Sequence, residues 1–408
     1  MTKTTVPKKN WTFMVYMAGD NDLDPNGVQD LKEMKKVGST KDINIIAQFD
    51  RAAGHKAKRY YLRKGGTVNA DAVVTLGKAN MGDPKLLTEF FQWGVKNYPA
   101  DRYILVLWNH GQGWDDTDIF AGERHRAMRR LPTGRVRHSL FHTPVRRMLK
   151  RAIHDTEARA ILIDDDAKDF LDNLEMKKVV SGAAKLLKRK LDILGMDACL
   201  MSMVEVGYQL RVGAMFTVGS EETEPLDGWP YDTILAELAK KPEMNAKDLS
   251  TLIVNKYLAS YDRDSVTQSA CDLSKADALA NAVTGLASAL KAKLGDTTVK
   301  QAILTARAQS QAYDVPDNID LVDFCSLLQQ AAVESTITDR CKEVISAATH
   351  GYLVAQGFKG AGLKDSHGVA IYFPTVAVSP LYAALDFSLK TGWDGFLKAY
   401  LTAVRSRP

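Results

Sequence analysis

The stretch Tyr103-Ile-Leu-Val-Leu-Trp-Asn-His-Gly111 places an Asn-His-Gly turn directly after a run of apolar and aromatic residues. A second stretch, Leu191-Asp-Ile-Leu-Gly-Met-Asp-Ala-Cys199, ends in the same way on a cysteine. Short apolar runs bounded by turn residues predict strands that are buried in a parallel sheet. Because ligands bind at the carboxyl ends of such strands, we expect His110 and Cys199 to meet at one edge of an α/β sheet.

The segments on both sides of these strands continue an alternating pattern. We predict strands at 11–17, 43–49 and 214–219, a hairpin at 59–63 and 72–76, and helices at 28–37 and from residue 84. Such alternation is typical of a mostly parallel sheet that is covered by helices on both faces.

After about residue 262 the pattern changes. Helices are predicted at 275–294, 299–312, 321–332, 339–356 and 393–404, with one strand at 369–373. We therefore predict an α/β domain over residues 1–262, which contains a basic insertion at about 117–160. A C-terminal α+β subdomain is predicted over residues 263–408.

The composition narrows the class of protein. The 408 residues are 45% hydrophobic and 25% charged, with a net charge of +5, which is ordinary for a globular protein. No apolar run approaches the roughly 20 residues of a membrane helix, so no membrane contact is expected. The four cysteines lack metal-ligand spacing and are too few for a disulfide framework. No secretory signal is visible, which predicts a cytoplasmic location for the chain as given.

The cysteine and the histidine suit covalent catalysis. A thiolate is the reactive form of cysteine, and a nearby base or a helix N-terminus favours it. We expect Cys199 to lie where a strand ends and a helix begins, and His110 to act as its acid and base. The amides of Gly111 and Cys199 are then candidates to stabilise an oxyanion. The alternative is that both side chains are simply buried in the core.

The chain resembles the clostripain-type cysteine peptidases of family C11, which are similar in fold to caspases. The motifs that carry the resemblance run nearly end to end: Met17-Ala-Gly-Asp-Asn-Asp-Leu23, Asn80-Met-Gly-Asp-Pro84, Trp108-Asn-His-Gly-Gln-Gly-Trp114, Leu194-Gly-Met-Asp-Ala-Cys-Leu-Met-Ser202 with Glu205, Gly219-Ser-Glu-Glu222 with Gly228-Trp-Pro-Tyr231, and Gly368-Val-Ala-Ile-Tyr-Phe-Pro374. The resemblance implies a caspase-like fold and an endopeptidase that cleaves after arginine or lysine. It also implies a Cys199–His110 dyad with no required third member. Members are often exported, so secretion is the alternative location.

The resemblance further implies that Asp197 lies at the base of the S1 pocket, where a carboxylate would select basic side chains. A turn or helix-cap role is the alternative for Asp197. Ser220 and Glu221 follow a predicted strand end and are expected near the substrate, and Trp229 is a candidate wall of the pocket. A solvated surface carboxylate and a loop anchor are the alternatives for Glu221 and Trp229.

The predicted insertion is strongly basic. Residues 124–159 contain ten arginines and one lysine against two carboxylates, which is typical of an exposed segment. The resemblance implies self-cleavage between the dyad residues, so we expect a processing loop here. The candidate cleavage sites are Arg129, Arg130, Arg135, Arg137, Arg146, Arg147 and Arg151. The alternative is a non-peptidase scaffold that binds an anionic partner through this segment, with nucleic acid the less favoured partner. A second alternative is amide hydrolysis or transamidation of a small molecule.

One motif suggests a metal but lacks the right context. The residues Asp22, Asp24, Asn26, Gly27 and Glu33 match the spacing of an EF-hand calcium loop, yet a strand is predicted before them where that loop needs a helix. We expect the segment to cap a helix and shape a rim of the site. The chemistry requires no cofactor; the resemblance allows Ca²⁺ at an unknown site, and the oligomeric state is not predicted.

Overall fold

The computed structural model describes residues 7–52, 54–114, 161–164, 169–332 and 334–405. A nine-stranded sheet forms the centre of this part of the chain. Its strand order is β12-β10-β9-β8-β5-β1-β2-β3-β4. The strands are β1 (Lys9–Gly19), β2 (Ile43–Arg51), β3 (Ala57–Tyr61), β4 (Ala72–Gly77), β5 (Ala100–Trp108), β8 (Leu191–Asp197), β9 (Ala214–Gly219), β10 (Val266–Asp272) and β12 (Leu353–Lys359).

The five central strands, β9, β8, β5, β1 and β2, are parallel to one another, and the strands on both sides of them pair antiparallel. The register places Met17 of β1 opposite Trp108 of β5, and Trp108 opposite Asp197 of β8. The carboxyl ends of three adjacent strands therefore lie side by side, as the apolar runs predict.

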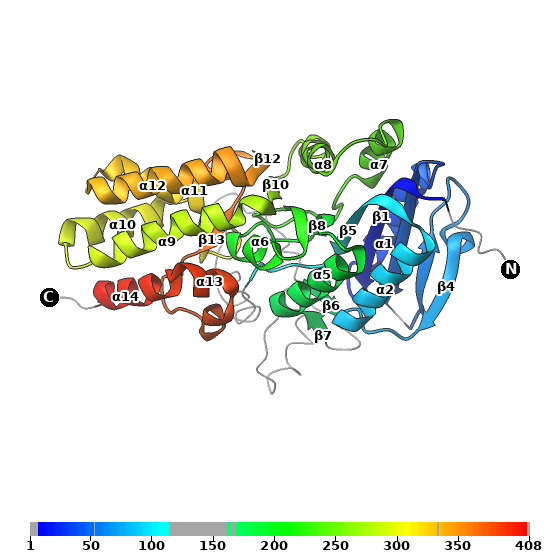
Figure 1. Cartoon of the computed structure of the whole chain (residues 1–408), viewed down its shortest axis with the longest axis horizontal. Helices are drawn as coiled ribbons and strands as arrows, with labels where there is room; N and C mark the ends of the chain where they lie inside the picture. The colour runs from blue at the N-terminus through cyan, green and yellow to red at the C-terminus, as the bar shows by residue number, and fades with distance from the viewer. Residues whose placement is uncertain (1–6, 53, 115–160, 165–168, 333, 406–408) are drawn as a thin grey trace, which may run out of the picture.

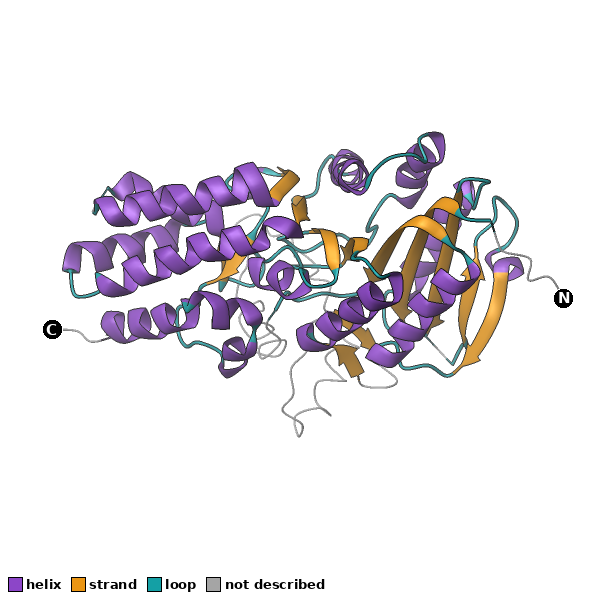
Figure 2. Cartoon of the chain, viewed as in Figure 1, coloured by secondary structure: helices purple, strands orange, loops and turns teal. Residues whose placement is uncertain are grey.

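Strand β1 shows why the sheet is covered on both faces. Its side chains alternate between two hydrophobic clusters, with Met14 and Tyr16 in one and Phe13 and Val15 in the other. A strand buried on both faces is apolar at nearly every position. Helices cover both faces (Figure 2): α2 (Pro84–Asn97) and α5 (Asn173–Leu187) share the first cluster, and α1 (Asp24–Val37), α7 (Tyr231–Lys240) and α8 (Ala246–Ser260) share the second.

Short local signals fix where helices of the first layer begin. Asp83 accepts a hydrogen bond from the Lys85 amide, and Pro84 occupies the first turn of α2. Asp172 and Glu175 form a reciprocal capping box at the start of α5. The helix predicted from Pro84 is confirmed, and so is the hairpin, which β3 and β4 form.

The C-terminal third is a helical bundle that extends from one end of the sheet, far from β4 (Figure 1). The remaining elements are β6 (Ile161–Asp164), β7 (Asp169–Leu171), α6 (Val204–Leu210), α9 (Ala276–Ala292), α10 (Thr297–Gln309), β11 (Asn318–Asp320), α11 (Leu321–Ala331), α12 (Ser335–Ala347), β13 (Ala370–Tyr372), α13 (Asp386–Thr391) and α14 (Trp393–Arg405). No helix among the described residues is long and apolar enough to cross a bilayer.

The structure corrects two predictions in this region. The helix expected over residues 339–356 is an α-helix only to Ala347, continues as a π-helix over Ala348–Tyr352, and gives way to β12 at Leu353. Because β12 is a half-exposed edge strand, its sequence lacks a clear alternation of apolar residues. Strands β10 and β12 both belong to the central sheet, so the sheet continues past the boundary expected near residue 262.

Candidate active site

The structure brings the histidine and the cysteine to the same edge of the sheet. His110 lies two residues after Trp108, and Cys199 lies two residues after Asp197, which is the register partner of Trp108. The amide of Asn109 donates a hydrogen bond to the Asp197 carbonyl at 3.3 Å, so the pairing continues past the strands. The two loops therefore leave adjacent strands at the same level.

Gly111 lies directly against the backbone of Cys199. A Cβ atom added at Gly111 would lie 2.5 Å from the Cys199 carbonyl oxygen and 3.1 Å from its amide nitrogen. Real Cβ atoms are not found so close to backbone oxygens, so this position needs glycine. The two amides expected to stabilise an oxyanion thus belong to backbone segments in direct contact.

Replacing Gly111 with alanine should push the cysteine loop away from β5. We expect the Gly111→Ala chain to lose about 1–3 kcal/mol of unfolding free energy, because overpacking forces the backbone to shift. Chemical denaturation measures this loss. Gly182→Ala is the matched control, since a Cβ atom there meets no atom within 4 Å, and it should not destabilise the fold. Equal stabilities of the two variants would contradict the close contact.

The surroundings of Cys199 differ from the prediction. Helix α6 begins at Val204, so Cys199 lies in a loop rather than at a helix N-terminus. Its side chain is 3% exposed, and the amide of Glu224 donates a hydrogen bond to Sγ at 3.3 Å. Burial raises the pKa of the thiol, and the hydrogen bond from the Glu224 amide offsets only part of this rise. The expectation that this position favours the thiolate is therefore wrong for this closed conformation, and a base must take the proton.

His110 is held by a carboxylate from a third strand end. Its ring is 2% exposed, and Nε2 lies 2.8 Å from Oδ1 of Asp22, which follows β1. Sequence reasoning placed Asp22 at a rim of the site but missed this contact. The motif Met17–Leu23 was the available signal.

Asp197 lies below the cysteine loop in a buried acidic pair. Its Oδ2 accepts hydrogen bonds from the Tyr231 hydroxyl at 2.7 Å and the Trp229 amide at 3.4 Å, and its carboxyl group hydrogen-bonds to that of Glu224. Burial raises the pKa of Asp197 to about 6. Burial and the charge of Asp197 raise the pKa of Glu224 well above its usual range. The proton of the pair therefore stays on Glu224, and Asp197 carries the charge.

The contacts of Asp197 argue against the helix-cap role and include residues that sequence reasoning missed. Asp197 caps no helix, because α6 has Met203 at its N-cap position. Tyr231 belongs to a quoted motif, but its contact with Asp197 was not foreseen. Glu224 could not be distinguished from the other polar residues that follow β9.

The other three residues expected in the S1 pocket are buried in the loop that follows β9. The hydroxyl of Ser220 is buried and lies 2.9 Å from the Thr267 hydroxyl. Glu221 accepts hydrogen bonds from the Tyr313 hydroxyl and the Gly368 amide in the C-terminal third. The Trp229 indole is fully buried and packs on the sheet, where a Cβ atom at Gly195 would lie 2.8 Å from it. These side chains hold the loop after β9 in place.

The EF-hand spacing does not form a calcium loop. Asp22 contacts His110, and Asp24 binds Arg51 through two hydrogen bonds of 2.8 Å. Asn26, Gly27 and Glu33 lie within α1. Within the described ranges, no group of three or more His, Cys, Asp or Glu side chains is arranged to hold a metal ion. A calcium requirement stays a prediction without a site.

All seven candidate arginines of the processing loop lie outside the described residues.

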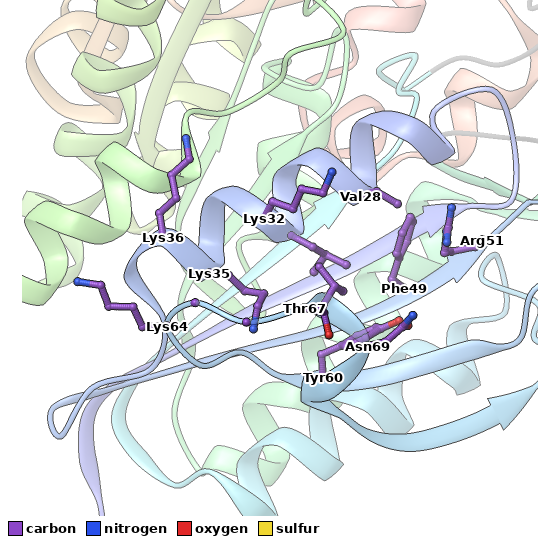
Figure 3. Close-up of a pocket in the computed structure, with 14 residues that line it drawn as sticks. Val28, Lys32, Lys35, Lys36, Phe49, Arg51, Tyr60, Lys64, Thr67 and Asn69 are labelled. Atoms are coloured by element: carbon purple, nitrogen blue, oxygen red, sulfur yellow. The ribbon is translucent and has the colours of Figure 1, made fainter.

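A cavity of about 610 Å³ lies apart from the site at the sheet edge, under α1 and against β2 and β3 (Figure 3). Its floor includes Phe49 and Tyr60, and lysines rim it. Three of its cations are already engaged: Lys35 binds Asp71, Lys36 binds Asp232 and Arg51 binds Asp24. Neither His110 nor Cys199 lines this cavity, so it is separate from the site at the sheet edge.

Comparisons with known proteins agree with this geometry. The sequence model of the clostripain family, Peptidase C11, matches residues 15–128 and 150–400. Clostripain from Hathewaya histolytica is 28% identical over 270 residues, which are 59% of this chain but only 44% of clostripain.

Two solved structures share the fold over 95% of this chain. A secreted C11 cysteine protease from Bacteroides thetaiotaomicron, in complex with an irreversible peptide inhibitor, has a TM-score of 0.65, 21% identity and 100% of its own chain covered. An inactive zymogen C11 protease from Parabacteroides distasonis has a TM-score of 0.67, 19% identity and 99% coverage. The predicted caspase-like α/β fold is thereby confirmed.

Proposed function

This chain belongs to the clostripain family, and from that premise we propose that it is a cysteine endopeptidase that cleaves peptide bonds after arginine or lysine. The observation that carries the proposal is the shared register of β5 and β8, which sets His110 and Cys199 at the same edge of the sheet. Two chemically complementary groups from separate parts of the chain thus reach the edge at which ligands bind in α/β sheets.

The chemistry follows from these groups. His110 takes the proton of the Cys199 thiol, and Sγ attacks the substrate carbonyl carbon, whose oxygen becomes an oxyanion near the amides of Gly111 and Cys199. The imidazolium then gives its proton to the leaving amine, and the C–N bond breaks to leave a thioester. Water, deprotonated by His110, attacks the thioester, and the acid product leaves as the thiol re-forms.

The acidic pair supports a basic substrate side chain. Asp197 and Glu224 are both buried, and among the described residues no lysine or arginine lowers the pKa of either carboxyl group. A buried carboxylate without a cation is costly. A substrate guanidinium or ammonium group would supply the missing charge, which is why we assign the S1 pocket to this pair.

The closed state of the site fits activation by processing. Cys199 and His110 are nearly inaccessible, so the surrounding loops must move before a peptide can reach them. Self-cleavage in the Arg-rich segment between them is the proposed trigger.

The B. thetaiotaomicron neighbour is a secreted protease, which favours secretion over the cytoplasm as the location of this chain.

An irreversible probe with a C-terminal arginine tests the proposal directly. We expect mass mapping of the labelled chain to find the modification on Cys199 and none in Cys199→Ala. Labelling of Cys199 by a small electrophile alone would favour a small-molecule amidase. An unreactive Cys199 together with salt-sensitive binding of polyanions would favour the scaffold alternative.

A further inference from the structure

Asp22 is placed at the site by the same sheet register as the other two groups. The order β1-β5-β8 sets three strand ends side by side, with Met17, Trp108 and Asp197 at one level. Asp22 follows the first of these strands, His110 the second and Cys199 the third. The three groups thus reach the edge in the order carboxylate, imidazole, thiol.

The turn that carries Asp22 is held firmly. The Asn21 side chain donates to the Ala18 carbonyl at 3.0 Å and accepts from the Leu23 amide at 2.9 Å. The Asn109 side chain, next to His110, donates to the same Ala18 carbonyl. One backbone oxygen therefore ties the Asp22 turn to the histidine loop, and the Asp22–His110 contact of 2.8 Å is preorganised.

The neighbouring carboxylate cannot take this role. Asp24, two residues further on, is bound at both oxygens by Arg51. The carboxyl and thiol side chains that follow the strands of this edge are those of Asp20, Asp22, Asp24, Cys199, Glu221, Glu222 and Glu224. Among them, Asp22 places Oδ1 at 2.8 Å from Nε2 of the His110 ring.

We propose that Asp22 is a positioning residue that keeps a proton on Nε2 of His110 and stabilises the cationic ring. The inference rests on the proposed function. The thiol proton then moves to Nδ1, and the positive charge of the ring is paired with the negative charge of the Asp22 carboxylate. Nδ1–H later protonates the leaving amine.

Asp22→Asn tests this role because it preserves shape and removes charge. We expect kcat to fall about tenfold to a hundredfold, with KM within about twofold of the wild type. The acidic limb of the kcat/KM profile should move to lower pH by about one unit, because the imidazolium loses its anionic partner and the ring stays neutral, and able to act as a base, at lower pH. Asp24→Asn is the matched control and should leave the profile unchanged. A wild-type rate and profile in Asp22→Asn, or a uniform loss at all pH values, would overturn the proposal.

A second readout does not depend on peptidase activity. The ring resonances of His110, assigned by comparison with His110→Gln, can be titrated by NMR in the inactive Cys199→Ala chain. Asp22→Asn should lower the pKa of this ring, and an unchanged titration refutes the inference even if the wild type cleaves no peptide. Failure of the wild type to cleave arginyl or lysyl substrates, with the titration shifted, would instead remove the proposed function alone.

Discussion

Cys199→Ala is expected to lower the hydrolysis of arginyl and lysyl peptide amides by at least about a thousandfold, to near the background rate. Without Sγ no thioester can form, and His110 alone cannot replace a nucleophile held at the strand end. Initial rates with a fluorogenic amide substrate measure the loss. His110→Ala should cause a loss of similar order, because the buried thiol then has no base.

The control for this prediction is another buried cysteine. Cys271 lies in β10, far along the sheet order from β5, and is 4% exposed. Cys271→Ala should keep the hydrolytic rate within about twofold, with thermal unfolding measured for both variants to separate folding from catalysis. Retained activity in Cys199→Ala would exclude Cys199 as the nucleophile.

Asp197→Asn is expected to remove the preference for basic side chains. We expect kcat/KM for arginyl and lysyl substrates to fall about a hundredfold to a thousandfold, since losing one partner of a buried charge pair costs about 3–4 kcal/mol. Neutral substrates of similar length should be cleaved no more slowly than by the wild type. A matched series with arginine, lysine, glutamine and norleucine before the scissile bond measures the preference.

A second buried carboxylate offers a close control. Glu205 in α6, like Asp197, accepts from a tyrosine hydroxyl and a backbone amide, here those of Tyr382 and Tyr372. Glu205→Gln should leave the preference unchanged. Glu224→Gln should cost less than Asp197→Asn, within about tenfold, because Glu224 is the protonated member of its pair. An unchanged preference in Asp197→Asn would refute the pocket.

The same assignment predicts a pH dependence. Asp197, with a pKa of about 6, is neutral below that pH and ionised above it. KM for arginyl substrates should therefore rise as the pH falls through 6, while KM for norleucine substrates stays flat. In Asp197→Asn the rise should disappear.

Several sequence predictions succeeded because their signals are local. The apolar runs before His110 and Cys199 identify buried strands, and Pro84 after Asp83 marks the start of a helix. Other features depend on distant contacts and could not be predicted from the local sequence. The edge strand β12 resembles the end of a helix in sequence, and the polar run after β9 gives no sign that Ser220 and Glu221 turn toward Thr267 and Tyr313.

The sequence by itself determined the secondary-structure elements near the site and the residue types that end its strands. The spacing of apolar residues and the residues that favour turns are both encoded within a few positions of the chain. Only the tertiary structure decided that β1, β5 and β8 are neighbours, and hence that Asp22 meets His110. It also decided that Asp197 shares a buried pocket with Glu224. Strand order and burial arise from contacts between residues that are far apart in the chain, such as Trp11 and Met244. The effect of burial on the pKa of a carboxyl group appears only when folding excludes water.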